Sequence, residues 1–226
     1  MRVAALAEGT EQAPRSLAEQ AYHRLTRMIT QLELAPGGLL VEKALMAALG
    51  IGRTPIREAL QRLSMEGLVV HQPNRGMFVA DITTTSVQHI YEFRSLIDAH
   101  LVRLAAERAD GAQIAELRSL AAELERTIAT DDMDRYVELD RRFYAVLAEA
   151  AQNIYLAEVI PRIFNLHLRL FFFISSRGRG WHDVAKAHTG MTRDVAEATA
   201  RHDADAAGQA VTAYIASRHQ DMRELL

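Results

Sequence analysis

The chain has 226 residues, of which 49% are hydrophobic and 24% charged, so it is long enough and apolar enough for two globular domains. It contains no cysteine, which excludes disulfide bonds and thiolate metal sites. The net charge of −3 is unevenly divided: residues 1–80 carry 9 Arg and Lys against 7 Asp and Glu, and residues 81–226 carry 17 against 22. A mildly basic first part before an acidic remainder suits a site-specific binder of a polyanion better than a protein that coats it.

Neither the start of the chain nor its most apolar run is typical of a secreted or membrane protein. Residues 1–14 lack a charged head followed by an apolar core and have little periodicity, so we expect a flexible arm there. The most apolar run, Leu166 to Ile174, is far too short to cross a bilayer and contains His167 and Arg169. We therefore expect a soluble, cytoplasmic protein with no membrane partner.

A first helix is expected after Ser16, whose hydroxyl suits a helix cap. Its apolar stripe consists of Leu17, Ala21, Leu25, Met28, Ile29 and Leu32. Pro36-Gly37-Gly38 ends this segment, and Leu39-Leu40-Val41 is expected to form a short strand that pairs with a later hairpin.

A tight turn at Gly50-Ile51-Gly52 separates two short amphipathic segments. Both glycines are expected to supply backbone freedom for the turn. Thr54 is expected to cap the second helix and Pro55 to take its first position. That helix buries Ile56, Ala59, Leu60 and Leu63 and stops at Gly67. Two short helices that meet at a glycine turn indicate a helix-turn-helix.

The segment that follows reads as strand, turn and strand. Val69-Val70-His71 and Met77-Phe78-Val79 flank the turn Gln72-Pro73-Asn74-Arg75-Gly76, which places Arg75 at the tip. A β-hairpin directly after a recognition helix is a wing. Together these features favour DNA binding over an ordinary charged helical surface, because arginines at a helix start attract phosphate and grip guanine. The residues expected to contact DNA are Lys43, Arg53, Thr54, Arg57, Gln61, Arg75 and Gly76.

The run Gly52-Arg53-Thr54-Pro55-Ile56-Arg57-Glu58-Ala59-Leu60, with Arg62-Leu63, Glu66-Gly67-Leu68 and Arg75-Gly76, resembles the winged helix-turn-helix of GntR-family repressors. The resemblance implies DNA contacts from Arg53, Thr54 and Arg57, with Gly76 at the wing tip. Two positions depart from the family pattern. Gly52 stands where serine is usual, and Lys43 stands where relatives often carry arginine, which replaces a planar fork with a point charge.

After the polar connector Asp81–Ser86 the pattern is helical throughout. Helices are expected near residues 87–109, 113–130, 132–150, 153–175, 181–202 and 203–225, and Pro161 is expected to kink or divide the fourth. The predicted fold class is therefore mainly α: a winged helix-turn-helix over residues 15–81, followed over residues 87–226 by an all-α antiparallel bundle of about six helices. Such bundles on a DNA-binding head commonly serve dimerisation and effector binding.

This second region resembles the C-terminal effector domain of the FadR subfamily, the FCD type. The matching residues are Arg94 in Tyr91-Glu92-Phe93-Arg94, Asp140 in Leu139-Asp140-Arg141-Arg142-Phe143, Asn153 before Tyr155-Leu156, and His188 in Ala187-His188-Thr189.

The resemblance also implies a metal site that is incomplete in this chain. Many relatives hold a divalent ion through an Asp, a His four residues later, and one His from each of the last two helices. Asp140 and His188 remain, whereas Tyr144 and Tyr214 replace the other two ligands. Neutral tyrosine is a poor ligand for such ions, so no metal cofactor is expected. The alternative is that a nearby histidine completes the set: His167, His182, His202 or His219.

We expect Arg94, Asp140, Tyr144, His188 and Tyr214 to line a polar cavity for a small effector. Arg94 would pair with an effector carboxylate, because a guanidinium presents a bidentate fork. The alternative for the tyrosines is core packing, and the alternative for Arg94 is an ion pair with a neighbouring acid.

The sequence thus predicts a homodimeric, ligand-responsive transcriptional regulator and not an enzyme. We expect a repressor that binds a short inverted-repeat operator in double-stranded DNA and is released by an organic-acid metabolite. One alternative is a DNA-binding dimer with no effector. Another is a metal-dependent hydrolase that uses Asp140 and His188, although no nucleophile elbow, phosphate loop or complete metal motif is present.

Overall fold

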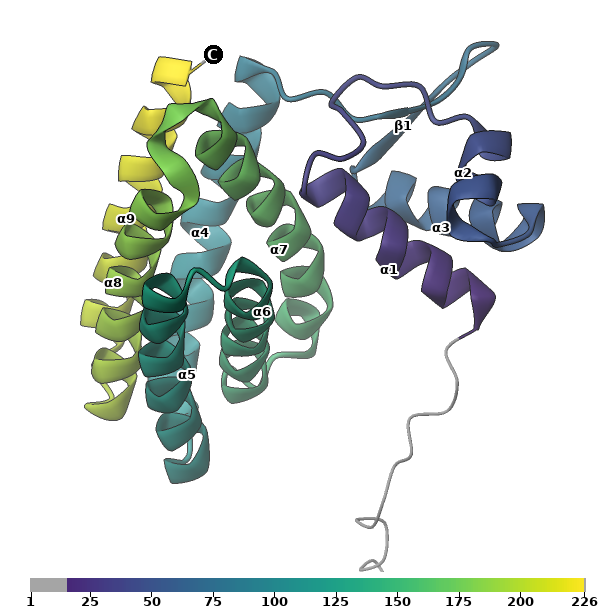
Figure 1. Ribbon diagram of the computed structural model, residues 1–226. Helices are drawn as coiled ribbons and strands as arrows, with labels where there is room; N and C mark the ends of the chain where they lie inside the picture. Colours follow the sequence, from purple (N-terminus) through teal and green to yellow (C-terminus); the bar gives the residue numbers. More distant parts are fainter. Residues whose placement is uncertain (1–15, 226) are drawn as a thin grey trace, which may run out of the picture. The chain divides into compact units, whose positions relative to one another are not determined.

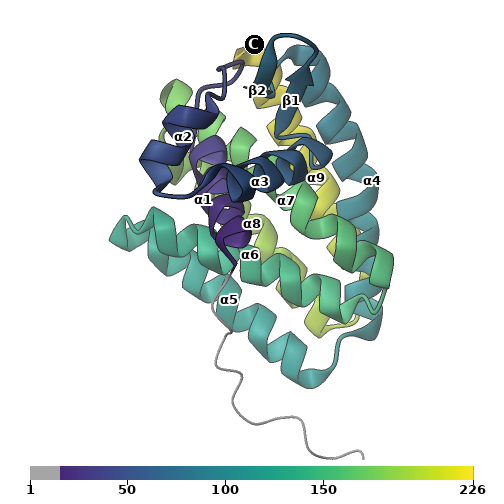
Figure 2. The same ribbon diagram turned by 90° about the vertical axis from the view of Figure 1, so that its right-hand side faces the viewer.

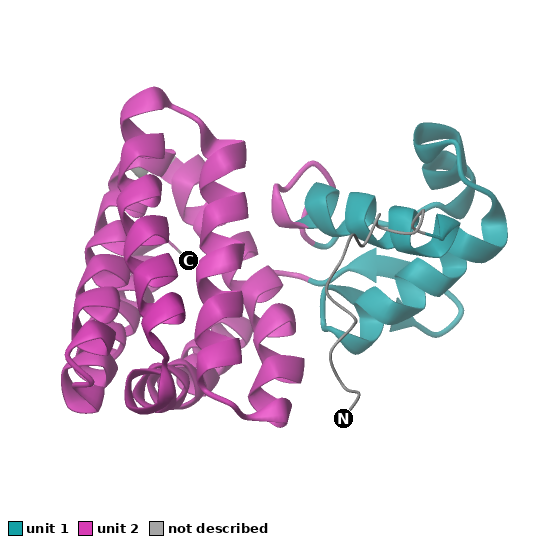
Figure 3. Ribbon diagram, turned by 90° about the horizontal axis from the view of Figure 1, so that it is seen from below, with its two compact units in different colours: residues 1–29, 37–80 teal, residues 30–36, 81–226 magenta. Residues whose placement is uncertain are grey.

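The computed structural model describes residues 16–225, apart from the side chains of residues 178 and 179. The expected arm, residues 1–14, lies outside this range. The chain divides into two compact units (Figure 3). The first contains the chain up to residue 29 and residues 37–80, and the second contains residues 30–36 and the chain from residue 81 onward. The short segment after the first helix thus belongs to the second unit, a division that the sequence pattern did not indicate.

The first unit contains α1 (Leu17–Thr30), α2 (Glu42–Leu49), α3 (Arg53–Met65), β1 (Val69–Gln72) and β2 (Gly76–Val79). A reciprocal cap starts α1: the Glu19 amide donates to Ser16 Oγ, and the Ser16 amide donates to Glu19 Oε2, both at 3.1 Å. The small core of this unit includes Leu25 from α1 and Leu60 from α3, each fully buried. This core holds α3 in place with its polar side in solvent.

The turn between α2 and α3 differs in detail from the sequence prediction. Gly50 has the expected positive φ of 67° and ends α2, whereas Gly52 has an ordinary φ of −68°. Gly52, not Thr54, is the cap residue of α3, so Thr54 and Pro55 are the second and third helical residues. Pro55 is still tolerated, because the first turn of a helix has no intrahelical partner for its amides.

The wing is an antiparallel hairpin in which Val69 pairs with Val79 and Gln72 with Gly76. Its turn closes through the Arg75 amide, which donates to the Gln72 carbonyl at 3.1 Å, while Asn74 has a φ of 61°. The expected strand at residues 39–41 is reduced to one bridge between Leu39 and Phe78. It does pair with the wing as predicted, which ties the wing to the segment before α2.

The second unit is a helical bundle (Figures 1 and 2). Helix α4 lies beside α9, and α5 lies beside α6 and α8. The predicted helices all occur, with ends within a few residues of those expected, and the described part of this unit has no strand. The bounds are α4 (Thr84–Arg108), α5 (Gly111–Thr130), α6 (Met133–Ala150), α7 (Ile154–Ile174), α8 (Gly180–Ala200) and α9 (Ala204–Leu225).

Side-chain caps explain why these helix ends are readable in the sequence. Thr83 and Asp110 each take part in a capping box, and Asp132 and Asn153 accept backbone amides at the starts of α6 and α7. Two features were less predictable. Helix α7 continues through Pro161 without division, and the expected break at residues 177–180 is instead a π-helical turn, Ser175–Arg179, that leads into α8.

We predict that Gly50→Ala destabilises the protein and that Gly52→Ser does not. A side chain at Gly50 is forced into the left-handed region, which costs roughly 1–2 kcal/mol, although no atom lies within 4 Å of the added Cβ. A serine at position 52 adds a cap hydroxyl to α3 in open space. Denaturant unfolding of the two variants checks this. Equal losses of stability in both would contradict the assignment of strain to Gly50 alone.

Candidate functional site

The first candidate site is the exposed surface of α2, α3 and the wing. All seven residues predicted to contact DNA are solvent-exposed. Arg53, Arg57 and Gln61 are four residues apart and therefore share one side of α3. The others are Lys43 in the first turn of α2, Thr54 in the first turn of α3, and Arg75 and Gly76 in the wing. Donor-rich side chains thus gather on consecutive elements of one small unit.

A carboxylate that the sequence reading left out joins the two arginines. Glu42, the first residue of α2, accepts a hydrogen bond from Arg57 Nε at 2.7 Å, and its other oxygen lies 3.7 Å from Arg53 Nε. Both guanidinium groups remain mostly exposed. Glu42 therefore holds the two arginine side chains at the same edge of the helix pair, with further donors free to face a ligand.

The second candidate site is a cluster of polar side chains inside the bundle. The structure brings together residues of α4, α6, α8 and α9 that are up to 120 positions apart in the sequence. All five residues predicted for the effector site are there, with exposed fractions of 1% for Arg94, 2% for Asp140, 6% for Tyr144, 0% for His188 and 7% for Tyr214. All five are therefore buried.

Arg94 is the centre of this cluster, and its guanidinium is engaged within the protein. Its Nε donates to Asp98 Oδ2 at 2.9 Å, and its Nη2 lies 2.8 Å from the same oxygen. Its Nη1 lies 2.7 Å from His167 Nδ1, and Nη2 donates to the Tyr144 hydroxyl at 3.5 Å. The ion-pair alternative for Arg94 is thus realised, and the neighbouring acid is Asp98, one turn along α4.

His188 and Asp140 form the other side of the cluster. His188 Nδ1 lies 2.7 Å from the Tyr136 hydroxyl, and its Nε2 lies 3.5 Å from Asp140 Oδ1. Both Nε2 and this carboxylate oxygen are buried without a hydrogen-bond partner. The rings of Tyr144 and Tyr214 flank His188, with centroids 6.5 and 5.4 Å away. Two facing unsatisfied polar atoms are costly, so this is the part of the bundle that a small polar ligand or a proton would affect most.

Burial sets the protonation states here. It raises the pKa of Asp140 to about 8, although Arg94 and Arg141 oppose this shift. It lowers the pKa of His188 to about 3, and that of His167 also falls well below its ordinary value, with Arg94 adding to both shifts. Burial alone lowers the pKa of Arg94, but the Asp98 carboxylate raises it above its ordinary value. Near neutral pH the cluster therefore holds one ion pair among neutral groups.

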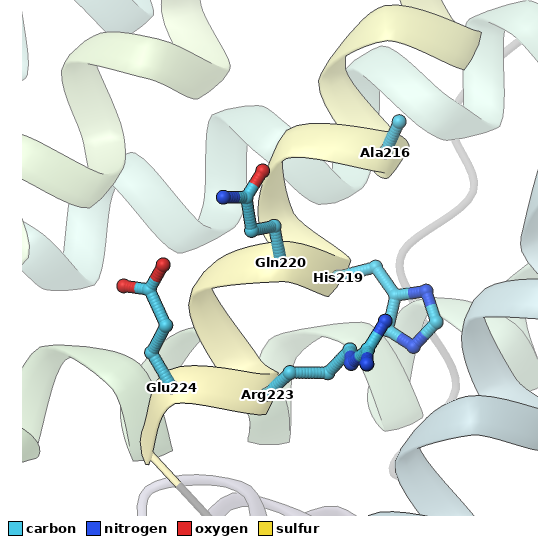
Figure 4. A pocket seen from close by; sticks show the side chains of 5 residues that line it. All are labelled: Ala216, His219, Gln220, Arg223 and Glu224. Carbon is cyan, nitrogen blue, oxygen red and sulfur yellow. The ribbon is translucent and has the colours of Figure 1, made fainter.

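The free space beside this cluster is small. A cavity of about 10 Å³ is lined by Arg94, Asp98, Tyr144, Ile160, Ile163, Phe164 and His167. That is room for about one water molecule, not for an organic acid. A second pocket is formed on the last turns of α9 by Ala216, His219, Gln220, Arg223 and Glu224 (Figure 4), and it shares no lining residue with this cavity.

Three members of the cluster were absent from the predicted site or only an alternative in it: Asp98, Tyr136 and His167. Asp98 is four residues after Arg94 and Tyr136 four before Asp140, so helical spacing places each beside a chosen residue. His167 was one of four histidines considered as replacement ligands. Its donor atom and those of Asp140 and His188 lie within 4.8 Å of one another, and His182, His202 and His219 are not part of this group.

The donor set does not fit a divalent ion as it stands. Asp140 Oδ1 and His188 Nε2 are unsatisfied and close enough to share one ion. His167, however, is bonded through Nδ1 to a guanidinium, which is a donor only. A histidine that binds a metal normally donates its other ring N–H to an acceptor. Two ligands make an incomplete shell, and we derive no role for a bound metal.

The exposed basic helix-turn-helix with its wing and the separate bundle with a buried polar core define a DNA-binding transcriptional regulator with an effector-type domain. The GntR family of bacterial regulatory proteins matches residues 17–79, and the FCD domain matches residues 89–217. The chain belongs to the GntR family and carries the FCD domain, as the sequence resemblance implied. It is a transcriptional regulator and not an enzyme.

Known relatives agree with this assignment. The chain is 30% identical over 163 residues to the Nta operon transcriptional regulator of Aminobacter aminovorans, which covers 71% of this chain and 73% of that protein. It is also 25% identical over 207 residues to the HTH-type transcriptional repressor RspR of Escherichia coli K12, and this match covers 92% of this chain and 89% of that protein. The solved structure of E. coli McbR/YncC has a TM-score of 0.77 at 21% identity, covering 94% of this chain and 98% of that one, and supports the fold. Among the described residues, no helix is long and apolar enough to cross a membrane.

We predict that Asp140→Asn changes how stability depends on pH. The folded state raises the pKa of Asp140 from 3.8 to about 8, so it binds more protons than the unfolded state between these values. The free energy of unfolding of the wild type should therefore fall, relative to the variant, as pH rises from 6.5 to 8. The lowered pKa of His188 affects stability only below its ordinary value of 6.5. Unfolding curves that stay parallel across this window would contradict the buried, protonated state of Asp140.

Proposed function

We propose that this regulator is a cytoplasmic homodimeric repressor that binds a short inverted-repeat operator and is released by a small carboxylate metabolite. The observation that carries the DNA part is the exposure of all seven predicted contact residues on α2, α3 and the wing. The effector part rests on the buried cluster around Arg94. Phe93 and Leu96, exposed apolar residues on α4, offer a surface for the second copy.

Operator recognition follows from the chemistry of the exposed arginines. A helix of this type enters the major groove with its N-terminal residues facing base edges, and two heads of a symmetric dimer read an inverted repeat. Arg53 and Arg57, ordered by Glu42, would grip guanine through their forks. The wing residue Arg75 would contact the sugar–phosphate backbone, which adds affinity but no sequence information.

Effector binding would depend on the charge of Arg94. A carboxylate that enters the cluster would share or replace Asp98 as the partner of the guanidinium, and the tyrosine hydroxyls and Asp140 would complete its hydrogen bonds. The present cavity holds about one water molecule, so α4 and α7 must move apart to admit the ligand. A ligand that binds only the opened bundle shifts the equilibrium toward it, and the two heads then lose the spacing that the operator requires.

The small cavity equally favours a second proposal, a DNA-binding dimer whose bundle binds no effector. In that case the polar cluster is a fully internal network around an ion pair. Operator binding measured with and without acetate, lactate, succinate and citrate separates the two. Release by one of these acids supports the first proposal, and no response to a broad panel of acids favours the second.

We predict that Arg53→Ala and Arg57→Ala each weaken binding to the operator by roughly 10-fold to 100-fold while leaving affinity for unrelated DNA nearly unchanged, if each forms a bidentate base contact. The matched control is Arg142→Ala, an exposed arginine of the bundle that pairs with Glu116 and Glu149. Fluorescence anisotropy with operator and scrambled duplexes at several salt concentrations gives both affinities. Unchanged operator binding in the two α3 variants would refute the recognition-helix assignment.

We further predict that Arg94→Lys and Tyr214→Phe weaken the response to the effector but not operator binding without it. Lysine keeps the charge and its pairing with Asp98 but lacks the fork, and phenylalanine removes only a buried hydroxyl. The acid concentration that halves operator binding should rise in both variants. An unaltered effector response in both would show that the ligand binds elsewhere.

A further inference from the structure

We infer that the buried cluster of this chain does not hold the divalent ion that the family resemblance implies. Its Asp140 and His188 could be completed only by His167, and Arg94, by its bond to His167, prevents this histidine from acting as a metal ligand. The inference deepens the proposed function, since it rests on the cluster being the effector site and says how an anionic effector is held there.

The direction of one hydrogen bond carries the argument. A guanidinium has five donors and no acceptor, so at 2.7 Å His167 Nδ1 must be the acceptor from Arg94 Nη1. A ring that accepts a hydrogen bond at Nδ1 is neutral, and its single proton is then on Nε2. If Nε2 bound a metal instead, that proton would move to Nδ1 and face the arginine N–H. Two donors at this distance repel each other, so His167 cannot ligate through either nitrogen while Arg94 stays.

His188 lacks this constraint. Its Nδ1 faces the hydroxyl of Tyr136, which can donate or accept, so its Nε2 is free to carry a lone pair toward Asp140. These two residues keep the geometry of a ligand pair. The difference between the two histidines is therefore their second partner: a hydroxyl for His188 and an arginine for His167.

Arg94 is held where it is. Asp98 contacts both Nε and Nη2 of Arg94, and the two side chains are only 1% and 2% exposed. Among the described residues, no other carboxylate is bonded to this arginine. Moving the guanidinium away would leave an unpaired buried charge, which is among the most costly changes in a protein interior. A metal ion would also meet a fixed positive charge in a medium that screens it poorly.

The consequence is an anion site that needs no metal. A carboxylate would find a cation already in place, with tyrosine hydroxyls around it, and its binding would be insensitive to chelators. Replacing the Arg94–Asp98 pair by neutral groups should release His167 and expose a site for a divalent ion made of Asp140, His167 and His188.

The test is the metal content of the full-length protein. Three proteins are compared: the wild type, a double variant with Arg94→Met and Asp98→Asn, and a triple variant that adds His167→Gln. Each is equilibrated with Ni²⁺ or Zn²⁺ and dialysed, and its bound metal and thermal unfolding midpoint are then measured. The paired substitution removes both charges, so no buried charge is left alone. We expect far less than one ion per wild-type chain, about one per chain with a raised midpoint in the double variant, and loss of both effects in the triple variant.

Two results would overturn the inference. One is that the wild-type protein retains one ion per chain and that His167→Gln alone removes this ion. This comparison needs no change at Arg94, so it can be made even if the double variant fails to fold. The other is a folded double variant that gains no ion. Neither readout involves DNA or an effector, so failure of the proposed function, seen as absence of operator binding or effector response, is distinguishable from failure of this inference.

Discussion

The bundle is organised around the buried ion pair between Arg94 and Asp98. Taking two charges out of water costs several kcal/mol for each, and the cost is recovered only when geometry and further hydrogen bonds satisfy them. Here the pair lies within one helix turn, and the remaining donors of the guanidinium reach His167 and Tyr144. The protonation of the surrounding groups follows: with a fixed positive charge in a dry interior, both cluster histidines stay neutral.

The two units are joined at more than one point of the chain. The chain passes between them at residues 29–30, 36–37 and 80–81, because the segment Thr30–Pro36 belongs with the bundle although it lies between α1 and α2. Leu32 in this segment has a φ of 64°, uncommon for a branched residue, and packs against the bundle core.

The sequence predicted most of the fold because its local signals were strong. Cap residues such as Asp110 and Asn153 mark helix ends, and the four-residue spacing of Arg53, Arg57 and Gln61 shows which side of α3 is polar. Thr54 was the wrong choice of cap because Gly52, which has no side chain to mark it as a cap, starts α3 two residues earlier than a Thr54 cap would. The hydrophobic pattern also could not show that the predicted strand at residues 39–41 is only a single β-bridge at Leu39.

The two candidate sites also differ in how far the sequence could predict them. The residues predicted to contact DNA come from consecutive elements of one unit, and all of them are exposed. The buried cluster depends on partners such as Arg94 and His167, which are 73 positions apart, and no spacing rule selects His167 over the other histidines of the bundle. The resemblance to the FCD domain identified Asp140 and His188. The other side chains that surround them are known only from the tertiary structure.

The central claim is that Arg94 fixes the tautomer of His167 and so keeps this histidine from completing a metal site in the buried cluster. The most direct measurement is the ring ¹⁵N NMR spectrum of the histidine-labelled full-length protein near neutral pH, with His167 assigned through His167→Gln. The account predicts a neutral His167 ring with its proton on Nε2, unchanged when a chelator is added. A proton on Nδ1, or a spectrum that shifts when metal is removed, would contradict it.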